Sequence, residues 1–316
     1  MLMPRPEYPR PLLVRPDWKN LNGSWRFVED VDDIGLVEGW FREEFPKSAA
    51  TIHVPFPVES EASTVNNIQP ASVVWYYREF DLPEDWDSRT CLRFGACDHW
   101  TRVFVNGQEV GQHRGGYAPF SFDIEHVLRP GANTIVVRVE DSLSWTQPRG
   151  KQAGTTRWPI DYDSVTGIWQ TVWLEPLPPV SIESTHSVFD VSSGELTFTA
   201  LFSKQVEGEL TVELLLAGVV VDRKQVNTGL RSEARVSFQL DEPVLWSPES
   251  PTLYDVKLTL LDTRSGDVDE VTSYTGLREI GVRDGHLLLN GKKLFLRGVL
   301  DQGYFPGGWY TALSDD

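Results

Sequence analysis

The chain has 316 residues, of which 40% are hydrophobic and 24% charged, so it has room for two or three domains and enough apolar surface for a core. Its 46 acidic residues exceed its 29 basic residues and give a net charge of −17. Nucleic acids and anionic membranes select basic surfaces, so we expect neither as a partner. Neither an apolar run of about 18 residues nor a signal-peptide core is visible, which predicts a cytoplasmic protein.

Helical periodicity is limited to one segment, 37–45, for which we expect about two turns. Elsewhere apolar and polar residues alternate with period two, which is typical of β-strands. Asn106-Gly107 favours a type I′ hairpin turn between two such runs. In 134–140 the side chains of Ile135, Val137 and Val139 share one face. The strands expected in this first region are 101–105, 108–113, 134–140 and 170–174.

A second β region follows the proline-rich linker 175–180. Ten of the 12 tryptophans precede residue 175, so composition changes at the same point and supports a domain boundary. The spacing of its strands and turns resembles a small sandwich. The strands expected here are 196–202, 209–221, 233–240 and 254–262. From Gly281 onward, Asn290-Gly291 predicts a further tight hairpin, followed by an apolar barrel-like strand at 294–300.

The cysteines and histidines give no sign of a metal site or a cofactor. Cys91 and Cys97 lie at the two ends of an expected strand that spans about 20 Å. A disulfide requires Cα atoms within about 7 Å, so we expect two free, buried thiols. The six histidines show no HxH or HxxxH spacing, and we expect neither a metal nor another cofactor.

The order of the motifs resembles glycoside hydrolase family 2, which includes β-galactosidases and β-glucuronidases. The resemblance covers essentially the whole chain and is most specific at Asp163–Pro176 (DSVTGIWQTVWLEP). The other matching stretches are NLNGSWRF (20–27), VPFPVES (54–60), WYYREFDLP (75–83), LRFGACDHWTRVFVNGQEVGQHRGG (92–116), YAPFSFDI (117–124), GANTIVVRVED (131–141), LWSPESPTLY (245–254) and LNGKKLFLRGV (289–299).

The resemblance implies an all-β architecture of two domains followed by the start of a barrel. It predicts a jelly-roll, galactose-binding-like domain over 1–178, an immunoglobulin-like β-sandwich over 179–280, and the first hairpin and strand of a truncated (β/α)8 barrel over 281–316. A complete barrel needs about 250 residues. The 36 residues from Gly281 onward are therefore too few to close one.

The resemblance also implies the chemistry of the parent protein, which is retaining hydrolysis of β-linked O-glycosides. Such enzymes use two carboxyl groups about 5–5.5 Å apart. In the family both are glutamates on later barrel strands, and no position here matches them. We therefore expect the chain alone to be inactive. A stand-alone carbohydrate-binding module without catalysis is the main alternative, and an adhesion or scaffold protein is a second one.

For the sugar site, the resemblance implies a rim contributed by the jelly roll. The aperiodic stretch 142–163 is long for a loop in a compact domain, and such loops are usually functional or disordered. An acidic residue before the Gly-Ile-aromatic motif binds sugar hydroxyls in the family, which assigns that role to Asp161 or Asp163. The remaining candidates for substrate binding are Asn66, Asn67, Trp145, Trp158 and Asp301.

Each of these residues also has a purely structural interpretation. Asn66 and Asn67 fit a polar turn, the two aspartates fit ordinary turns, and Arg149 and Lys151 fit a solvated basic loop. Most tryptophans, among them Trp25, Trp169 and Trp173, fit the core. The partner predicted from the resemblance is a carbohydrate, and the full-length parent is compatible with a homo-oligomer.

Overall fold

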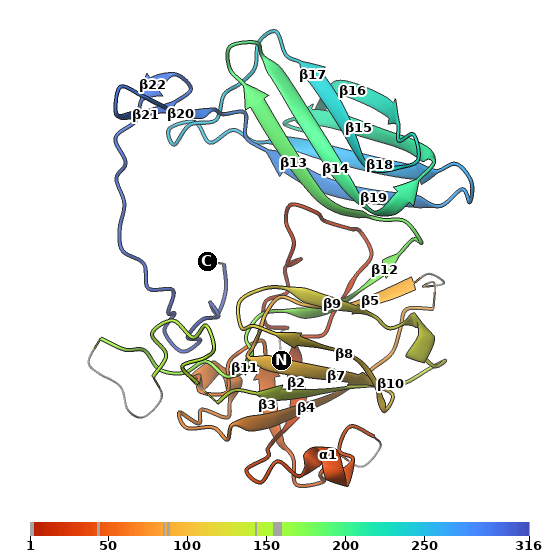
Figure 1. The fold of residues 1–316 in the computed structure, drawn as a ribbon, viewed down its shortest axis with the longest axis vertical. Helices are drawn as coiled ribbons and strands as arrows, with labels where there is room; N and C mark the ends of the chain where they lie inside the picture. Colours follow the sequence, from red (N-terminus) through yellow and green to blue (C-terminus); the bar gives the residue numbers. More distant parts are fainter. Residues whose placement is uncertain are drawn as a thin grey trace. The chain divides into compact units, whose positions relative to one another are not determined.

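The computed structural model describes residues 3–42, 45–84, 86, 89–142, 144–153 and 160–315, and their regular structure is almost entirely β (Figure 1). The chain divides into two compact units. The first unit comprises Met1–Pro9, Trp18–Pro176 and Asp301–Asp316, and the second comprises Arg10–Asp17 and Leu177–Leu300. Among the described residues, no helix is long and apolar enough to cross a membrane.

The first unit is a jelly roll of antiparallel sheets (Figure 1). Its larger described sheet has the order β3 (Ala50–Val54), β2 (Gly23–Glu29), β4 (Val73–Phe80), β10 (Asn133–Glu140), β7 (Trp100–Val105) and β8 (Gln108–Arg114). The smaller sheet has the order β1 (Lys19–Asn20), β12 (Val172–Leu177), β5 (Arg89–Phe94) and β9 (Phe120–Asp123). A short ribbon pairs β11 (Gly167–Ile168) with β6 (Cys97–Asp98), and the short helices are α1 (Gly35–Glu38), η1 (Glu61–Ser63) and η2 (Glu125–Val127).

Alternation along the strands sends one set of side chains into the core of the jelly roll. Ile135, Val137 and Val139 of β10 are fully buried there, as their shared face predicted. Trp25 of β2 lies in the same core. Cys91 and Cys97 are buried and free, as their separation predicted.

The opposite face of the six-stranded sheet carries a second, smaller core. Trp40 and Phe45, from the segment between β2 and β3, pack with Trp75 and Phe104 of the sheet. The two-turn helix expected at 37–45 is wrong, because α1 is a single turn that ends at Gly39 with a φ of 72°. Packing of two aromatic side chains on the sheet, rather than helical periodicity, places this segment.

The hairpin turns follow their sequence signals. Asn106 and Gly107 have φ values of 50° and 80° between β7 and β8. Asn290 and Gly291 have φ values of 51° and 74°. Positive φ at both central residues is what a type I′ turn requires, so the two predicted turns are confirmed.

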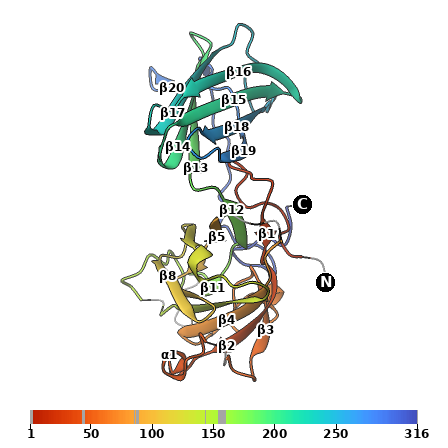
Figure 2. The same ribbon diagram turned by 90° about the vertical axis from the view of Figure 1, so that its right-hand side faces the viewer.

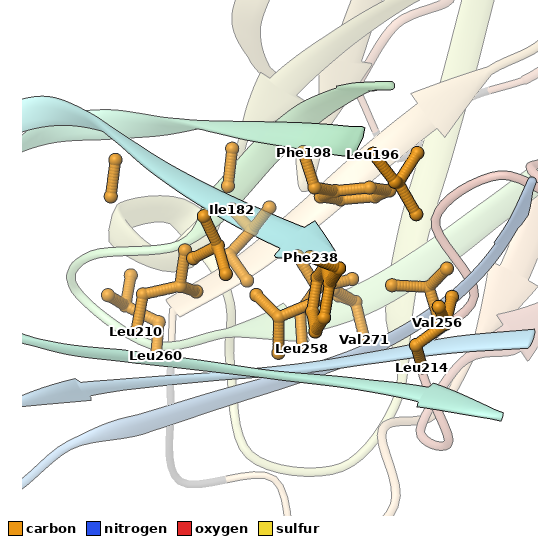
Figure 3. Packing of buried hydrophobic residues seen from close by; sticks show 14 of the residues in the cluster. Ile182, Leu196, Phe198, Leu210, Leu214, Phe238, Val256, Leu258, Leu260 and Val271 are labelled. Carbon is orange, nitrogen blue, oxygen red and sulfur yellow. The ribbon is translucent and has the colours of Figure 1, made fainter. Parts of the chain in front are cut away.

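The second unit is an immunoglobulin-like sandwich of two antiparallel sheets (Figure 2). One sheet has the order β13 (Ile182–Asp190), β14 (Glu195–Val206) and β17 (Arg231–Gln239). The other has the order β16 (Val219–Asn227), β15 (Gly208–Leu216), β18 (Tyr254–Asp262) and β19 (Val268–Thr275). Phe198 and Phe238 from the first sheet meet Leu214 and Leu258 from the second in the core (Figure 3).

One strand expected in this region is in fact two. The run 209–221 is interrupted at Ala217 and Gly218, which have φ values of 50° and 79° and connect β15 to β16. The expectation of a single strand was wrong because apolar residues continue on both sides of this turn. The turn also lacks the Asn-Gly pair that marks the turns at Asn106-Gly107 and Asn290-Gly291.

The segment Arg10–Asp17 is fixed to the sandwich by a buried ion pair. Val14 forms an isolated antiparallel bridge with Thr272 of β19. The Arg15 Nε and Nη2 atoms donate hydrogen bonds of 3.0 and 2.9 Å to the two carboxylate oxygens of Asp269. Both side chains are at least 96% buried, so this segment is an integral part of the second unit.

The last hairpin consists of β20 (Ile280–Arg283), β21 (His286–Leu289) and β22 (Lys292–Lys293). The apolar run 294–300 forms no strand in the described structure, unlike the sequence expectation. Val299 and Leu300 are 93% and 86% exposed. A buried barrel strand needs a hydrogen-bonding neighbour on each side, and none of the described strands pairs with this run.

Candidate functional site

The long loop after β10 is closed at its base by backbone pairing. The Tyr162 amide donates to the Lys151 carbonyl at 3.0 Å, and the Ala153 amide donates to the Tyr162 carbonyl at 3.2 Å. Residues 154–159 lie outside the described residues. Asp161 and Asp163 flank the paired Tyr162, so the two candidate sugar ligands share one short, held segment. Both side chains are partly exposed.

Gln152 connects this base to the interior of the jelly roll. The residue is 99% buried although it lies in a loop. Its Nε2 atom donates to Asp98 Oδ2 at 3.2 Å and to the Tyr117 hydroxyl at 3.1 Å. Its Oε1 atom accepts a hydrogen bond of 2.7 Å from the Val165 amide. Both ends of the side-chain amide are therefore used within the fold.

Two further buried carboxyl groups hold the chain on either side of the loop. Glu59 Oε2 accepts a hydrogen bond of 3.0 Å from the Thr166 amide. Asp141 Oδ2 accepts one of 3.3 Å from the Thr166 hydroxyl, and Asp141 Oδ1 accepts one of 2.6 Å from Gln147 Nε2. Glu59 is fully buried and Asp141 is 95% buried. Thr166 thus joins two carboxyl groups that come from distant parts of the chain.

Burial dominates the proton affinity of this cluster. It raises the pKa of Glu59 from 4.5 to about 8, and Asp141 adds a smaller increase that the hydrogen bonds from Thr166 oppose. Burial likewise raises the pKa of Asp98 from 3.8 to about 7, assisted by Asp141 and opposed by the hydrogen bond from Gln152. Near neutral pH Glu59 is therefore mostly protonated and Asp98 is partly protonated. Because they are sealed from solvent, we regard them as structural groups.

The glycine of the DSVTGIW motif has a steric role. Gly167 has a φ of 86°, and a Cβ atom there would lie 1.9 Å from the hydroxyl oxygen of Tyr76. The Ile168 amide points to the same oxygen at 3.4 Å. Only glycine satisfies both the left-handed backbone and this close approach. The turn that follows the loop is therefore fixed against the buried tyrosine.

The last residues of the chain pack against the base of the long loop and the DSVTGIW motif. The Tyr304 hydroxyl donates to the Asp163 carbonyl at 2.8 Å, and its ring lies 5.0 Å from that of Tyr162. The Thr311 hydroxyl is within hydrogen-bonding distance of the carbonyl oxygens of Pro55 and Trp169. The segment Asp301–Asp316 is thus part of the first unit and covers both ends of the DSVTGIW motif.

The two asparagines lie in turns. The Asn67 side chain donates to Glu29 Oε1 at 2.8 Å and accepts from the Gln69 amide at 3.1 Å. Asn66 is exposed and has a φ of 51°. The contacts of Asn67 favour the turn interpretation for this residue, whereas the exposed Asn66 side chain is open to a ligand.

The remaining candidates divide by exposure. Trp145 is 91% exposed, with the Arg149 guanidinium 3.8 Å from the centre of its ring. Trp158 lies outside the described residues. Asp301 is exposed and its Oδ1 atom accepts a hydrogen bond of 2.8 Å from the Gly303 amide, as in a turn. No contact in the described structure joins Asp301 to the base of the loop.

A cavity of about 440 Å³ lies beside the first part of the loop. Ser144 and Gln147 of the loop face Trp100 and Glu140 of the six-stranded sheet across it. Its volume falls in the range of small-molecule sites, and its lining combines an aromatic ring with polar groups. Among the described residues, no group of three or more His, Cys, Asp or Glu side chains is placed to hold a metal ion.

Sequence reasoning missed the buried polar residues that organise the site. Glu59, Asp98 and Gln152 each lie inside a quoted motif or the long loop, but none was singled out. One signal was available for Glu59, because a carboxylate within the otherwise apolar VPFPVES stretch must be satisfied or neutralised when buried. No comparable signal existed for Gln152, whose partners come from other segments.

The described structure is an all-β jelly roll with a held polar loop, together with an immunoglobulin-like sandwich. A model of the sugar-binding domain of glycosyl hydrolases family 2 matches residues 18–178, and a second model of the same family matches 180–278. The chain therefore belongs to glycosyl hydrolases family 2, as the order of its motifs predicted.

The curated relatives are glycosidases that are longer than this chain. The β-glucuronidase of Paenibacillus borealis is 30% identical over 313 residues, which cover 92% of this chain and 50% of that protein. The β-galactosidase of Thermoanaerobacter pseudethanolicus is 29% identical over 309 residues, which cover 92% of this chain and 39% of that protein. The chain spans about half the length, or less, of these relatives.

Solved structures support the fold. The β-glucuronidase from Ruminococcus gnavus in complex with D-glucuronic acid superposes with a TM-score of 0.75 at 24% identity, covering 91% of this chain and 50% of that one. Its complex with D-glucaro-d-lactam gives a TM-score of 0.79 over 95% of this chain and 52% of that one, also at 24% identity. At this level of identity the likeness establishes the all-β architecture.

Proposed function

We propose that this chain is the N-terminal portion of a retaining β-glycosidase and supplies the rim of its sugar site. The observation that carries the proposal is the base of the long loop. There Asp161 and Asp163 are held on one short segment between buried carboxyl groups and the Tyr304 hydroxyl. A held segment with two partly exposed carboxylates suits recognition of sugar hydroxyls, because pre-placed acceptors lose little entropy on binding.

The substrate class proposed is a β-linked glycoside. Two of the relatives are named β-glucuronidase and β-galactosidase. Glucuronic acid and galactose both present hydroxyl groups that can donate hydrogen bonds to a carboxylate. In this proposal Asp161 or Asp163 binds the sugar, and Asn66, Trp145 and Trp158 complete the rim. Asn67 and Asp301 contribute through the turns in which they lie.

We propose a separate role for each of three parts of the chain. In this proposal residues 1–178 bind sugar, residues 179–280 form a scaffold sandwich, and residues 281–316 begin the catalytic barrel. Six acidic residues among those described are at least 95% buried and so are closed to a substrate: Asp30, Glu59, Asp98, Asp141, Glu175 and Asp269. A retaining mechanism needs two accessible carboxyl groups about 5–5.5 Å apart. We therefore propose that this chain alone does not turn over glycosides.

The test is an assay of the purified chain with nitrophenyl β-D-glucuronide and nitrophenyl β-D-galactoside. No release of nitrophenol is expected above the background set by buffer alone. The same assay on the product of the gene extended beyond Asp316 should show hydrolysis, and its loss in an Asp161→Asn or Asp163→Asn variant would identify the sugar ligand. Turnover by the 316-residue chain at a glycosidase-like rate would contradict the assignment.

A carbohydrate-binding module without catalysis is the second candidate. The observation that favours it is Trp145, whose ring is 91% exposed on the loop and so is open to a sugar face on at least part of its surface. Titration with D-glucuronic acid and D-galactose, followed by tryptophan fluorescence, separates the two. Binding tighter than about millimolar by the chain alone favours the module. If the chain alone does not bind either sugar, with Trp145 intact or replaced, the result favours a sugar-site rim that requires the catalytic barrel.

A further inference from the structure

We propose that Gln152 is a positioning residue whose buried side chain fixes the backbone that carries Asp161 and Asp163. The inference rests on the proposed function, because this placement matters to a sugar only if the segment forms the rim. The physical claim itself concerns the loop and can be tested without any sugar.

Three contacts of Gln152 converge on the rim segment. Its backbone forms an isolated parallel bridge with Tyr162, the residue between the two aspartates. Its Oε1 atom accepts from the Val165 amide at 2.7 Å, two residues beyond Asp163. Its Nε2 atom donates a hydrogen bond of 3.2 Å to Oδ2 of Asp98, which is buried in the interior. Gln152 therefore connects the two backbone segments at the base of the loop, 151–153 and 160–165, to the core of the jelly roll.

Only a side-chain amide satisfies this arrangement. The position requires a donor toward Asp98 and an acceptor toward Val165 at the same time, and glutamine supplies one of each on a single planar group. Leucine would provide neither, and would leave the Val165 amide and Asp98 Oδ2 buried without these partners. A buried donor or acceptor without a partner destabilises the fold, because it has lost water without gaining another hydrogen bond. Glutamate would keep the acceptor but place a second carboxyl group against Asp98.

The surroundings of Asp98 make that substitution sensitive to pH. Asp141, Cys97, Tyr117 and Tyr310 interact with Asp98 electrostatically, and none of these four groups carries a positive charge. Asp98 Oδ1 is buried without a hydrogen-bond partner in the described structure. Two facing carboxyl groups here would repel when both are ionised. When one is protonated, its hydroxyl group can donate to the other and replace the lost bond.

The experiment is hydrogen–deuterium exchange of the full 316-residue chain, read on peptides that cover 160–165. Gln152→Leu is expected to lower the protection of these amides by about tenfold or more, because it removes the acceptor of the Val165 amide and the donor to Asp98. Gln152→Glu is expected to show the same loss near pH 8.5 and to recover most of the protection near pH 5.5, after correction for the intrinsic exchange rate. A residue that merely fills space would show no such recovery.

The matched control is Gln147→Leu. Gln147 lies in the same loop and also donates to a buried carboxylate, Asp141, but no described contact ties it to 160–165. Its substitution should raise exchange within 144–150 and leave 160–165 protected. Urea unfolding of each variant shows that the first unit remains folded.

Two results would overturn the proposal. One is unchanged protection of 160–165 in both Gln152 variants at both pH values. The other is an equal loss in the Gln147→Leu control, which would mean that the loop behaves as one cooperative segment. Because no sugar is used, a failure of the glycosidase assignment leaves this result standing, and the reverse also holds.

Discussion

Replacing Glu59 by glutamine should change how the stability of the first unit depends on pH. Burial raises the pKa of Glu59 from 4.5 to about 8 in the folded chain, so folding retains a proton that the unfolded chain releases. The stability associated with this proton is fully present below pH 4.5 and is lost as the pH rises towards 8. The total loss corresponds to about 5 kcal/mol, and about half of it falls between roughly pH 6 and pH 8.5.

Glutamine removes this titration with little change in shape. It keeps an oxygen that can accept the hydrogen bond from the Thr166 amide. Its NH₂ group takes the place of the buried Glu59 Oε1 atom, which has no hydrogen-bond partner in the described structure. Between about pH 6 and pH 8.5, the free energy of unfolding should therefore fall by about 2–3 kcal/mol less in Glu59→Gln than in the wild type. At the upper end of that range the variant should be the more stable protein.

The assay is urea unfolding followed by tryptophan fluorescence at a series of pH values. Every tryptophan except Trp246 belongs to the first unit, so the signal reports the unit that contains Glu59. Glu61→Gln is a suitable control, because Glu61 is an exposed carboxyl group two residues along the chain. It should follow the wild-type curve within about 0.5 kcal/mol. Parallel curves for the wild type and Glu59→Gln would refute a protonated, buried Glu59.

Two further substitutions test the packing of each unit. Gly167→Ala places a Cβ atom 1.9 Å from the buried hydroxyl of Tyr76, whereas Gly131→Ala has an equally positive φ but open space around it. Gly167→Ala should therefore destabilise the first unit by about 2 kcal/mol more than Gly131→Ala in urea unfolding. Equal losses of stability in the two variants would show that backbone strain alone is responsible. Arg15→Met leaves Asp269 buried without its ion pair and should destabilise the sandwich by about 3–5 kcal/mol. The exposed pair of Arg264 offers the control, because Arg264→Met should cost less than about 1 kcal/mol when both variants are compared with the wild type by thermal unfolding.

Most strands could be predicted because burial on one face imposes alternation on the sequence. The predicted strand 254–262 has the bounds of β18, and the two Asn-Gly turns were also correct. The exceptions have local causes. The turn at Ala217-Gly218 is hidden within a continuous apolar run, and α1 is too short for a helical period to matter. The run 294–300 has strand composition but no pairing partner among the described strands.

The candidate site was less predictable, because its organisation depends on contacts between distant segments. Asp98 and Gln152 are 54 residues apart, and the partners Glu59 and Thr166 are 107 apart. Alternation reports which face of a strand is buried, but it carries no information about which loop residue reaches that face. The sequence did single out the loop by its length and Asp161 and Asp163 by resemblance.

The buried contacts explain why two motifs that are far apart in the chain occur together. VPFPVES supplies Glu59, and DSVTGIW supplies Thr166 and Gly167, which contact Glu59 and Tyr76 respectively. Removing the side-chain acceptor at Glu59 would leave the buried Thr166 amide without this partner, at a cost of about 1–3 kcal/mol. The loop that carries Asp161 lies between these anchors, so its geometry is determined by the interior of the jelly roll more than by its own sequence. Substitutions that leave Asp161 and Asp163 untouched but alter this interior should therefore affect the sugar recognition that we propose for them.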